Sequence, residues 1–412
     1  MLPALGFVRF ATTLTLQFSL PTERTLDTLS PAAATELRAD LGLVNQAVRA
    51  SVVPGRAAAA DRHWQQWLAF AASVNVDPWL HSVLDPIPLL QVFAARYRDG
   101  RLAPSHGPVR SRTVEDAVRS VGQTFARVGA KDVRKDALGG IDFRLQRQLR
   151  AYAKADPAPA RVKPIPIQLL FYALSAAHAA PHADAMLAIA DMAVIAFYFL
   201  LRPGEYTGAS ADNTPFTLAD VQLFLGARRL DLFTAPPADL RAATAVSLTF
   251  TTQKSGVRGE VVQHGRSGSA HCCPTRAVAR RVLHLRHHVA SPTTPLGTYY
   301  APSAPGGPVR RHPVTSADIT GLLRTAAQAL GPELGLLPCD IQACSLRAGG
   351  AMALLCAKVD SNIIRLLGRW QSDVMMRYLH LQAQPIMNEF ASRMLRGGNY
   401  VLAPGLNVPT HL

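Results

Sequence analysis

Five side chains between residues 202 and 378 could together break a phosphodiester. They are, in order, Arg202, Lys254, Arg347, Arg369 and Tyr378. Guanidinium groups can hold the non-bridging oxygens of a phosphate and offset the charge that develops there during attack, in place of Mg²⁺. An ammonium group can protonate the leaving oxygen. A phenol, whose ordinary pKa is about 10, becomes a nucleophile where neighbouring cations favour its ionised form.

These residues lie in short, recognisable stretches of sequence. LLRPGE (200–205) ends an apolar stretch, KSG (254–256) is a predicted turn, CSLRAGGA (344–351) and LLGRWQS (366–372) carry the later arginines, and MRYLH (376–380) places the tyrosine nine residues after Arg369. Taken singly, Arg202 could satisfy carbonyls at a helix C-terminus, Lys254 could be an exposed turn residue and Tyr378 a core residue. Their order and spacing together favour a site.

The same stretches resemble the tyrosine recombinase (phage integrase) family. Residues 200–205 resemble its first arginine box, 344–351 its H-x-x-R box, and 367–380 its L-G-H/R…Y box. The form SLRAGGA with LGRW is most similar to the eukaryotic mobile-element branch, which includes DIRS-like retrotransposons and Crypton-like transposons. The catalytic resemblance covers roughly residues 163–394, and the helical first half more weakly resembles the family's core-binding domain, which clamps DNA.

The resemblance implies a site-specific DNA recombinase or integrase that works without a cofactor or metal. Arg202 and Arg347 would clamp the scissile phosphate, and Lys254 would protonate the leaving 5′ oxygen. Tyr378 would form a covalent 3′-phosphotyrosyl bond whose energy is conserved for rejoining. Glu205 would support the first arginine box, with His380 as a further accessory residue.

Two positions depart from the family pattern. Cys344 stands where the family has histidine, and a thiol is a poor substitute for imidazole in hydrogen bonding and proton transfer. Arg369 stands where His or Trp is usual; a third guanidinium could donate to the phosphate, and the adjacent Trp370 could pack or substitute. The alternative is a catalytically impaired DNA-binding derivative of such an enzyme. A type IB topoisomerase ranks third, because nothing resembles its extra domains.

The elements that would position the site follow from apolar periodicity and proline. The predicted fold is mainly α with a small antiparallel β-sheet: a helical core-binding domain and an α+β catalytic domain. Apolar faces at three- and four-residue spacing predict helices in the first half: Trp64, Trp67, Phe70 and Ala71; Leu89, Val92, Phe93 and Tyr97; Val114, Val118, Val121 and Phe125. The predicted divisions are an unassigned segment (1–30), the core-binding domain (31–156), a proline-rich linker (157–166), the catalytic domain (167–396) and a tail (397–412).

Within the second domain the period changes from helical to alternating. Helices are predicted at about 167–179, 183–201 and 275–288, strands at 246–251 and 260–263 with 228–233 as a further candidate, a loop at 291–313, and mainly helix to 394. Gly349 and Gly350 could allow close approach of DNA or close helix packing. Ile386, Phe390 and Met394 would form a tail helix that docks on a neighbouring protomer, to give a homo-tetramer on DNA, or on its own domain.

The charge balance indicates a polyanionic partner. Lys and Arg number 43 against 28 Asp and Glu, for a net charge of +15, and 37 of the 43 are Arg. Guanidinium grips phosphate bidentately, although GC-rich coding also enriches Arg. We expect double-stranded DNA as the partner. Arg144, Arg147 and Arg150, at steps of three, would form either a solvated helix face or a DNA-backbone contact.

The number of cysteines and the hydropathy of the chain indicate the cellular compartment in which the protein is expected. Five cysteines, an odd number confined to the second half, favour a reducing interior over a secreted disulfide scaffold. The expected location is intracellular, and the nucleus if the source is eukaryotic. The apolar run 186–201 is too short to span a bilayer, so no membrane partner is expected. His284, His287 and His288 share a helical face, but their spacing matches no standard zinc pattern.

Overall fold

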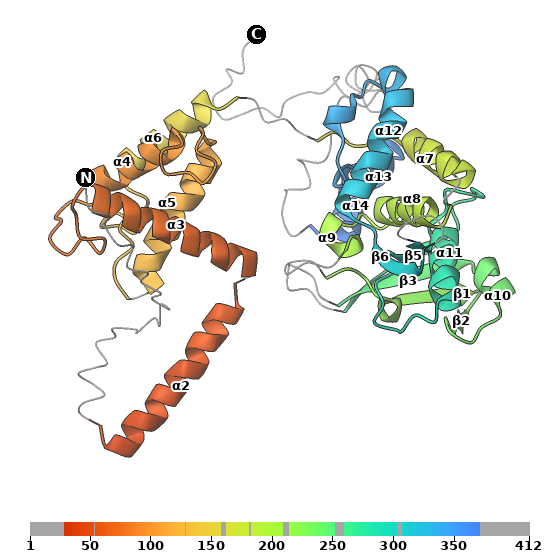
Figure 1. The fold of residues 1–412 in the computed structure, drawn as a ribbon, viewed down its shortest axis with the longest axis horizontal. Coiled ribbons are helices and arrows are strands. Elements are labelled where there is room, and N and C mark those ends of the chain that lie inside the picture. The colour runs from red at the N-terminus through yellow and green to blue at the C-terminus, as the bar shows by residue number, and fades with distance from the viewer. Residues whose placement is uncertain are drawn as a thin grey trace, which may run out of the picture. The chain divides into compact units, whose positions relative to one another are not determined.

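A computed structural model describes residues 29–52, 54–127, 129–157, 162–180, 183–208, 214–251, 259–302 and 307–370. The chain divides into two compact units, Met1–Pro159 and Ala160–Leu412 (Figure 1). The division falls inside the predicted linker at 157–166. The predicted tail at 397–412 and the predicted tail helix lie outside the described residues, as does nearly all of segment 1–30.

Most helices of the first unit pack around aromatic side chains. Its described helices are α2 (Pro31–Ala50), α3 (Pro54–Ser73), α4 (Ile87–Arg98), α5 (Ser111–Arg127) and α6 (Phe143–Ala155). Trp64, Trp67 and Phe70 of α3 are buried, as their spacing predicts, and the Trp67 ring lies edge-on to Phe93 at 5.3 Å. The Trp67 indole N–H donates to the carbonyl of Pro78 at 2.9 Å, so the ring is buried without an unpaired donor.

The apolar face predicted for α4 is wrong in part. Phe93 and Tyr97 are buried, but Val92 is 43% exposed, and Leu90, with Ile87, takes the buried positions instead. Because the sequence pairs apolar residues at 89–90 and 92–93, two helix faces about 100° apart are equally apolar. Packing against α5 and α6 selects the face that begins at Ile87.

The second unit surrounds helix α8 (Ala183–Tyr198) with helices and two antiparallel sheets (Figure 1). The helices are α7 (Ile167–Ala179), α9 (Pro203–Tyr206), α10 (Pro237–Ala242), α11 (Pro274–His287), α12 (Ser316–Leu334), α13 (Ser345–Cys356) and α14 (Ser361–Leu367), with 3₁₀ turns η1 (Leu218–Asp220) and η2 (Pro338–Asp340). The predicted fold class, mainly α with a small antiparallel sheet, is confirmed.

Four strands form the larger sheet in the order β2-β1-β3-β4. They are β1 (Val221–Leu225), β2 (Arg228–Leu230), β3 (Ala245–Phe250) and β4 (Glu260–Gly265). The predicted strands at 246–251 and 260–263 correspond to β3 and β4, which pair from Ala245 opposite Gly265 to Phe250 opposite Glu260. The candidate strand at 228–233 ends early, at Leu230.

Part of the predicted loop at 291–313 is instead a second, two-stranded sheet. Strands β5 (Thr298–Pro302) and β6 (Val309–Pro313) pair with Tyr299 opposite His312. The prolines and glycines of this stretch hide the strands, because they weaken the alternating pattern that identifies one. The pair is held to the rest of the unit where the Val314 carbonyl accepts from the backbone N–H of Gly208 at 2.8 Å.

After its first turn, helix α8 carries one charged side chain, that of Asp191, which is fully buried. The Asp191 carboxylate accepts from Nε and Nη2 of Arg280 on α11, at 3.0 and 2.5 Å. This ion pair fixes α8 against α11. Among the described residues, no helix has the length and apolarity that a membrane span requires.

Removal of the buried carboxylate should destabilise the second unit. In Asp191→Ala the Arg280 guanidinium loses its partner, and we expect the free energy of unfolding to fall by about 3 kcal/mol. Chemical denaturation measures the change. Arg228→Ala, which breaks an exposed ion pair with Asp239, is the control and should cost about 0–1 kcal/mol. Equal losses in the two variants would contradict this role for Asp191.

Candidate active site

The site begins where helix α8 ends. The Leu201 N–H donates to the Ala196 carbonyl at 3.0 Å and the Leu200 N–H to Phe197 at 3.4 Å, which is the Schellman pattern of helix termination. Leu200 takes the left-handed position of this motif, with φ 50°, where glycine is usual. The carbonyls of Phe199 and Leu200 therefore leave the helix without intrahelical donors, at the negative end of its dipole.

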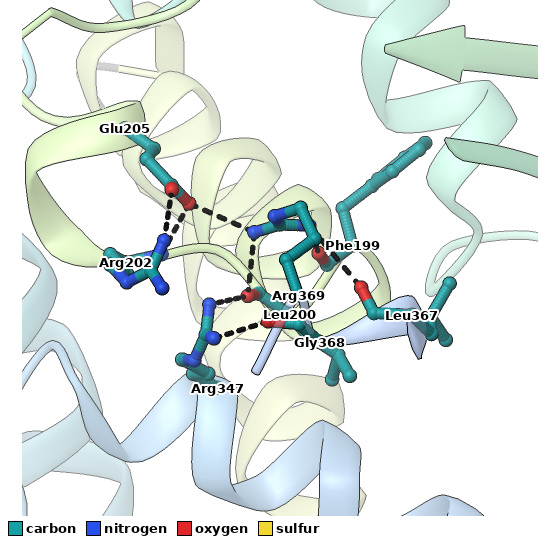
Figure 2. Close-up of polar contacts among 8 residues, drawn as sticks. All are labelled: Phe199, Leu200, Arg202, Glu205, Arg347, Leu367, Gly368 and Arg369. Carbon is teal, nitrogen blue, oxygen red and sulfur yellow. Dashed lines mark hydrogen bonds and ion pairs between the residues drawn. The ribbon is translucent and has the colours of Figure 1, made fainter. Parts of the chain in front are cut away.

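Helix α14 ends in the same way. The Trp370 N–H donates to the Arg365 carbonyl at 3.0 Å and the Arg369 N–H to Leu366 at 2.9 Å. Arg369 holds the left-handed position, with φ 55°. This geometry turns the Arg369 side chain back toward the end of α8, so that the two helix ends face each other through their carbonyls and an arginine (Figure 2).

Arg347, on the first turn of α13, bridges the two helix ends. Its Nη1 donates to the Leu200 carbonyl at 2.6 Å, and its Nη2 donates to the Gly368 carbonyl (Figure 2). The guanidinium lies 4.3 Å from the centre of the Trp370 ring, and Arg347 is only 3% exposed. The second arginine box is thus tied to the first through backbone carbonyls.

Arg202 and Glu205 form the exposed side of the cluster. Arg202 is the N-cap of α9, and its backbone N–H donates to Glu205 Oε2 at 2.7 Å while its Nη1 donates to Oε1 at 2.9 Å. The Arg202 side chain is 33% exposed, against 2% for Arg369. Of the three cluster arginines, Arg202 is therefore the one best able to reach a ligand in solvent.

Arg369 makes its contacts inside the protein. Its Nη1 donates to the carbonyls of Phe199 and Leu367, and its Nη2 to the Leu200 carbonyl and Glu205 Oε2, at 3.1–3.3 Å. The guanidinium lies 3.7 Å from the centre of the Phe250 ring. Burial lowers the pKa of Arg369 to about 10, while Glu205 opposes the shift. Arg369 thus stays charged at neutral pH.

The structure decides between the two interpretations of Gly349 and Gly350. A Cβ on Gly349 would lie 2.4 Å from the Ile165 carbonyl oxygen, and one on Gly350 would lie 2.1 Å from that of Phe197. Both glycines are buried where α13 packs on α8 and on the segment before α7. They permit close packing of α13 on α8, and this packing fixes the position of Arg347 relative to the end of α8.

Cys344 lies at the N-cap of α13, three residues before Arg347. Its thiol is half-buried, and burial raises its pKa above the ordinary value. The Sγ contacts Gln342 Oε1 at 3.9 Å. At neutral pH this position therefore holds a neutral, weak hydrogen-bond donor, where an imidazole would offer a stronger one.

Lys254, Tyr378 and His380 lie outside the described residues. Phe250 and Glu260, the paired strand ends that flank the predicted lysine turn, are described, and the Phe250 ring contacts Arg369. Sequence reasoning missed Phe250 and the carbonyls of Phe199 and Leu200; the left-handed Leu200 gives no signal in a sequence.

The three arginines at positions 144, 147 and 150 of α6 differ in whether a carboxylate already offsets their charge. Arg144 forms a bidentate ion pair with Asp85, at 2.5 and 3.0 Å, and also pairs with Asp142. Arg147 and Arg150 are exposed, and the Arg147 guanidinium lies 5.2 Å from the centre of the Phe143 ring. The charge of Arg144 is thus offset by carboxylates, which leaves Arg147 and Arg150 as the stronger candidates for DNA contact.

The histidine cluster is held by neighbouring aromatic groups. His284 Nε2 accepts from the backbone N–H of Tyr300 at 3.1 Å, and the His288 ring stacks on Tyr300 at 4.4 Å. Burial lowers the pKa of His284 to about 4, so its ring is neutral at physiological pH. Across the described ranges, no group of three or more His, Cys, Asp or Glu side chains could hold a metal ion.

Comparisons with known proteins give structural likeness at low similarity. No protein-family model and no curated protein matches the chain. The Tn1549 transposon integrase in complex with transposon right end DNA is 14% identical with a TM-score of 0.42, over 75% of this chain and 84% of that chain. The same integrase with circular intermediate DNA is 15% identical with a TM-score of 0.43, over 81% and 99%.

The glycine packing can be tested by adding one methyl group. Gly350→Ala should lower the free energy of unfolding by about 1–3 kcal/mol, because α13 must move away from the Phe197 carbonyl. The matched control is Gly321→Ala in α12, where an added Cβ meets nothing within 4 Å; it should stabilise by up to about 1 kcal/mol. If the two variants have the same stability, α13 is not packed as described.

The state of Cys344 can be tested by alkylation. The thiolate is the reactive form, so a raised pKa predicts slow reaction of Cys344 with iodoacetamide at pH 7 and a rate that still rises above pH 9. Mass spectrometry of digested protein follows the site, with the exposed Cys339 as internal control. Faster labelling of Cys344 than of Cys339 at pH 7 would show that the thiolate is stabilised.

Proposed function

We propose that the chain cleaves and rejoins DNA as a tyrosine recombinase. The observation that carries the proposal is the convergence of Arg202, Arg347 and Arg369, which come from three separate sequence boxes, around the ends of α8 and α14. Two of these guanidinium groups, those of Arg202 and Arg369, contact a single carboxylate there, that of Glu205. The excess of positive charge suits a phosphate.

In the proposed reaction, Arg202 and Arg347 hold the non-bridging oxygens of the scissile phosphate. The Tyr378 phenol loses its proton to water and its Oη attacks phosphorus, while the bond from phosphorus to the 5′ oxygen breaks and Lys254 gives that oxygen a proton. A 3′-phosphotyrosyl ester results, and attack by a 5′ hydroxyl reverses the step. One phosphodiester replaces another, so the reaction requires no high-energy cofactor.

We also propose a family branch, an assembly on DNA and a role for each domain. The boxes SLRAGGA and LGRW favour the eukaryotic mobile-element branch, with a nuclear site of action and a homo-tetramer assembled on DNA. Residues 31–156 would act as a core-binding domain, with Arg147 and Arg150 on the DNA backbone, and residues 167–396 as the catalytic domain. Trp370, stacked on Arg347, would hold that guanidinium in place.

Cys344 favours a second candidate function, a DNA-binding protein derived from such an enzyme. A neutral thiol cannot supply the charged donor that histidine would offer beside a phosphate. Cys344→His separates the two functions. In an active enzyme the imidazole should increase cleavage or leave it unchanged, whereas in a derivative no cleavage appears and binding still weakens with salt.

A covalent adduct tests the proposed function. The protein is incubated with a pool of nicked duplexes of random sequence, and complexes that survive denaturant are recovered and their DNA sequenced. Wild type should yield adducts whose linkage maps to Tyr378, and Tyr378→Phe should yield none. Tyr172→Phe, a tyrosine on α7, is the control and should keep the adduct. Equal absence of adduct from wild type and Tyr378→Phe would reject the enzyme.

A further inference from the structure

We propose that Arg369 is a positioning residue that orients the Arg202–Glu205 pair and joins the ends of α8 and α14, and that it does not touch the phosphate. This inference rests on the proposed function, because it assigns Arg369 a part in that reaction. It differs from the expectation that a third guanidinium donates to the DNA.

The donors of Arg369 are already used. A guanidinium has two N–H groups on each Nη and one on Nε. The four Nη donors match four protein acceptors: the carbonyls of Phe199, Leu200 and Leu367, and Glu205 Oε2 (Figure 2). Nε is buried and has no partner within the described ranges. The side chain is 2% exposed, so none of its N–H groups faces solvent.

The Phe250 ring closes one face of the guanidinium. At 3.7 Å from the ring centre, Arg369 is packed between the sheet and the end of α8. A phosphate oxygen could reach the guanidinium only after the ring moved and at least one carbonyl lost its donor. A buried carbonyl left without a donor destabilises the fold, so this approach is unfavourable.

The Glu205 carboxylate transmits the effect of Arg369 to Arg202. Oε1 accepts from Arg202 Nη1 at 2.9 Å, while Oε2 accepts from the Arg202 backbone N–H at 2.7 Å and from Arg369 Nη2 at 3.1 Å. Arg369 thus balances the charge of Glu205. The charge of Arg202, whose side chain is one-third exposed, is then left to attract an anion.

The second effect of Arg369 is on Arg347. Both guanidinium groups donate to the Leu200 carbonyl, at 2.6 Å from Arg347 and 3.3 Å from Arg369. If Arg369 is shortened, the carbonyls of Phe199 and Leu200 keep only part of their donors. Arg347 already donates to the Leu200 carbonyl, and we expect it to be drawn further toward these two carbonyls.

A neutral phosphate analogue separates positioning from phosphate contact. A duplex that forms the adduct is prepared with a methylphosphonate at the mapped scissile position, which removes the charge that an arginine would offset. On ordinary DNA, Arg202→Ala should slow adduct formation by about 10²–10³-fold, and Arg369→Lys by about 10²-fold through misplacement. On the methylphosphonate, Arg202→Ala should approach the wild-type rate, whereas Arg369→Lys should keep its full loss.

Three further variants test the coupling between Arg369 and Glu205 and control for unfolding. Glu205→Gln keeps an acceptor for the Arg202 N–H but removes the carboxylate, and should behave as Arg369→Lys does on both substrates. The double variant, with both Glu205→Gln and Arg369→Lys, should form the adduct no more slowly than either single variant, since the two residues act as a unit. Asp191→Asn, destabilised away from the cluster and assayed below its Tm, should keep the wild-type ratio of rates on the two substrates.

The outcomes distinguish the inference from the proposed function. If wild type reacts and the methylphosphonate restores Arg369→Lys as fully as Arg202→Ala, Arg369 contacts the phosphate and the inference is wrong. The same holds if Arg369→Lys loses nothing on ordinary DNA, or if the losses of the double variant multiply. If wild type forms no adduct on any duplex, the proposed function fails and the inference fails with it.

Discussion

The C-terminal carbonyls of α8 and α14 lack donors within their own helices, and this need shapes the candidate site. Phe199 and Leu200 end α8, and Leu367 and Gly368 end α14. Arg347 and Arg369, which lie 147 and 170 residues from the α8 carbonyls that they contact, supply the missing donors. Because a buried carbonyl without a partner is costly, the helix ends, Arg347 and Arg369 are held in one arrangement, and Arg202 is presented at its edge.

The same arrangement explains how the cluster can hold three like charges. Each buried guanidinium faces carbonyl oxygens and an aromatic ring, Trp370 for Arg347 and Phe250 for Arg369. The carbonyls lie at the negative ends of helix dipoles, which favour cations. Glu205 adds one full negative charge. The excess that remains is concentrated on the more exposed Arg202, which is where an anionic ligand would approach.

The candidate site residues and their order along the chain could be predicted from the sequence, but the interactions that hold them in place could not. The fold class, strands β3 and β4 and the helices that precede Arg202 follow from apolar periodicity and from the alternating pattern at 246–251. The face of α4 and the β5–β6 pair do not, because adjacent apolar residues and scattered prolines leave the local pattern ambiguous. The left-handed Leu200 and Arg369 are invisible in a sequence, since tertiary contacts, not residue type, select that conformation.

The distinction between contact and support at Arg369 likewise could not come from residue types. A guanidinium is chemically suited to both roles. The number of filled donors separates them, and it depends on where the chain returns 170 residues after the end of α8. The same is true of Gly349 and Gly350, whose two interpretations differ only in what lies opposite them.

The most direct test of the account is a crystal structure of the Tyr378→Phe variant bound to an uncleaved DNA duplex from the adduct selection. We predict the scissile phosphate within hydrogen-bond distance, about 3 Å, of the Arg202 and Arg347 guanidinium groups. The Lys254 ammonium should lie beside the 5′ oxygen, the ring at position 378 should face phosphorus, and Arg369 should remain on Glu205 and the helix-end carbonyls. A duplex bound on another surface, with the arginine cluster empty, would contradict the account.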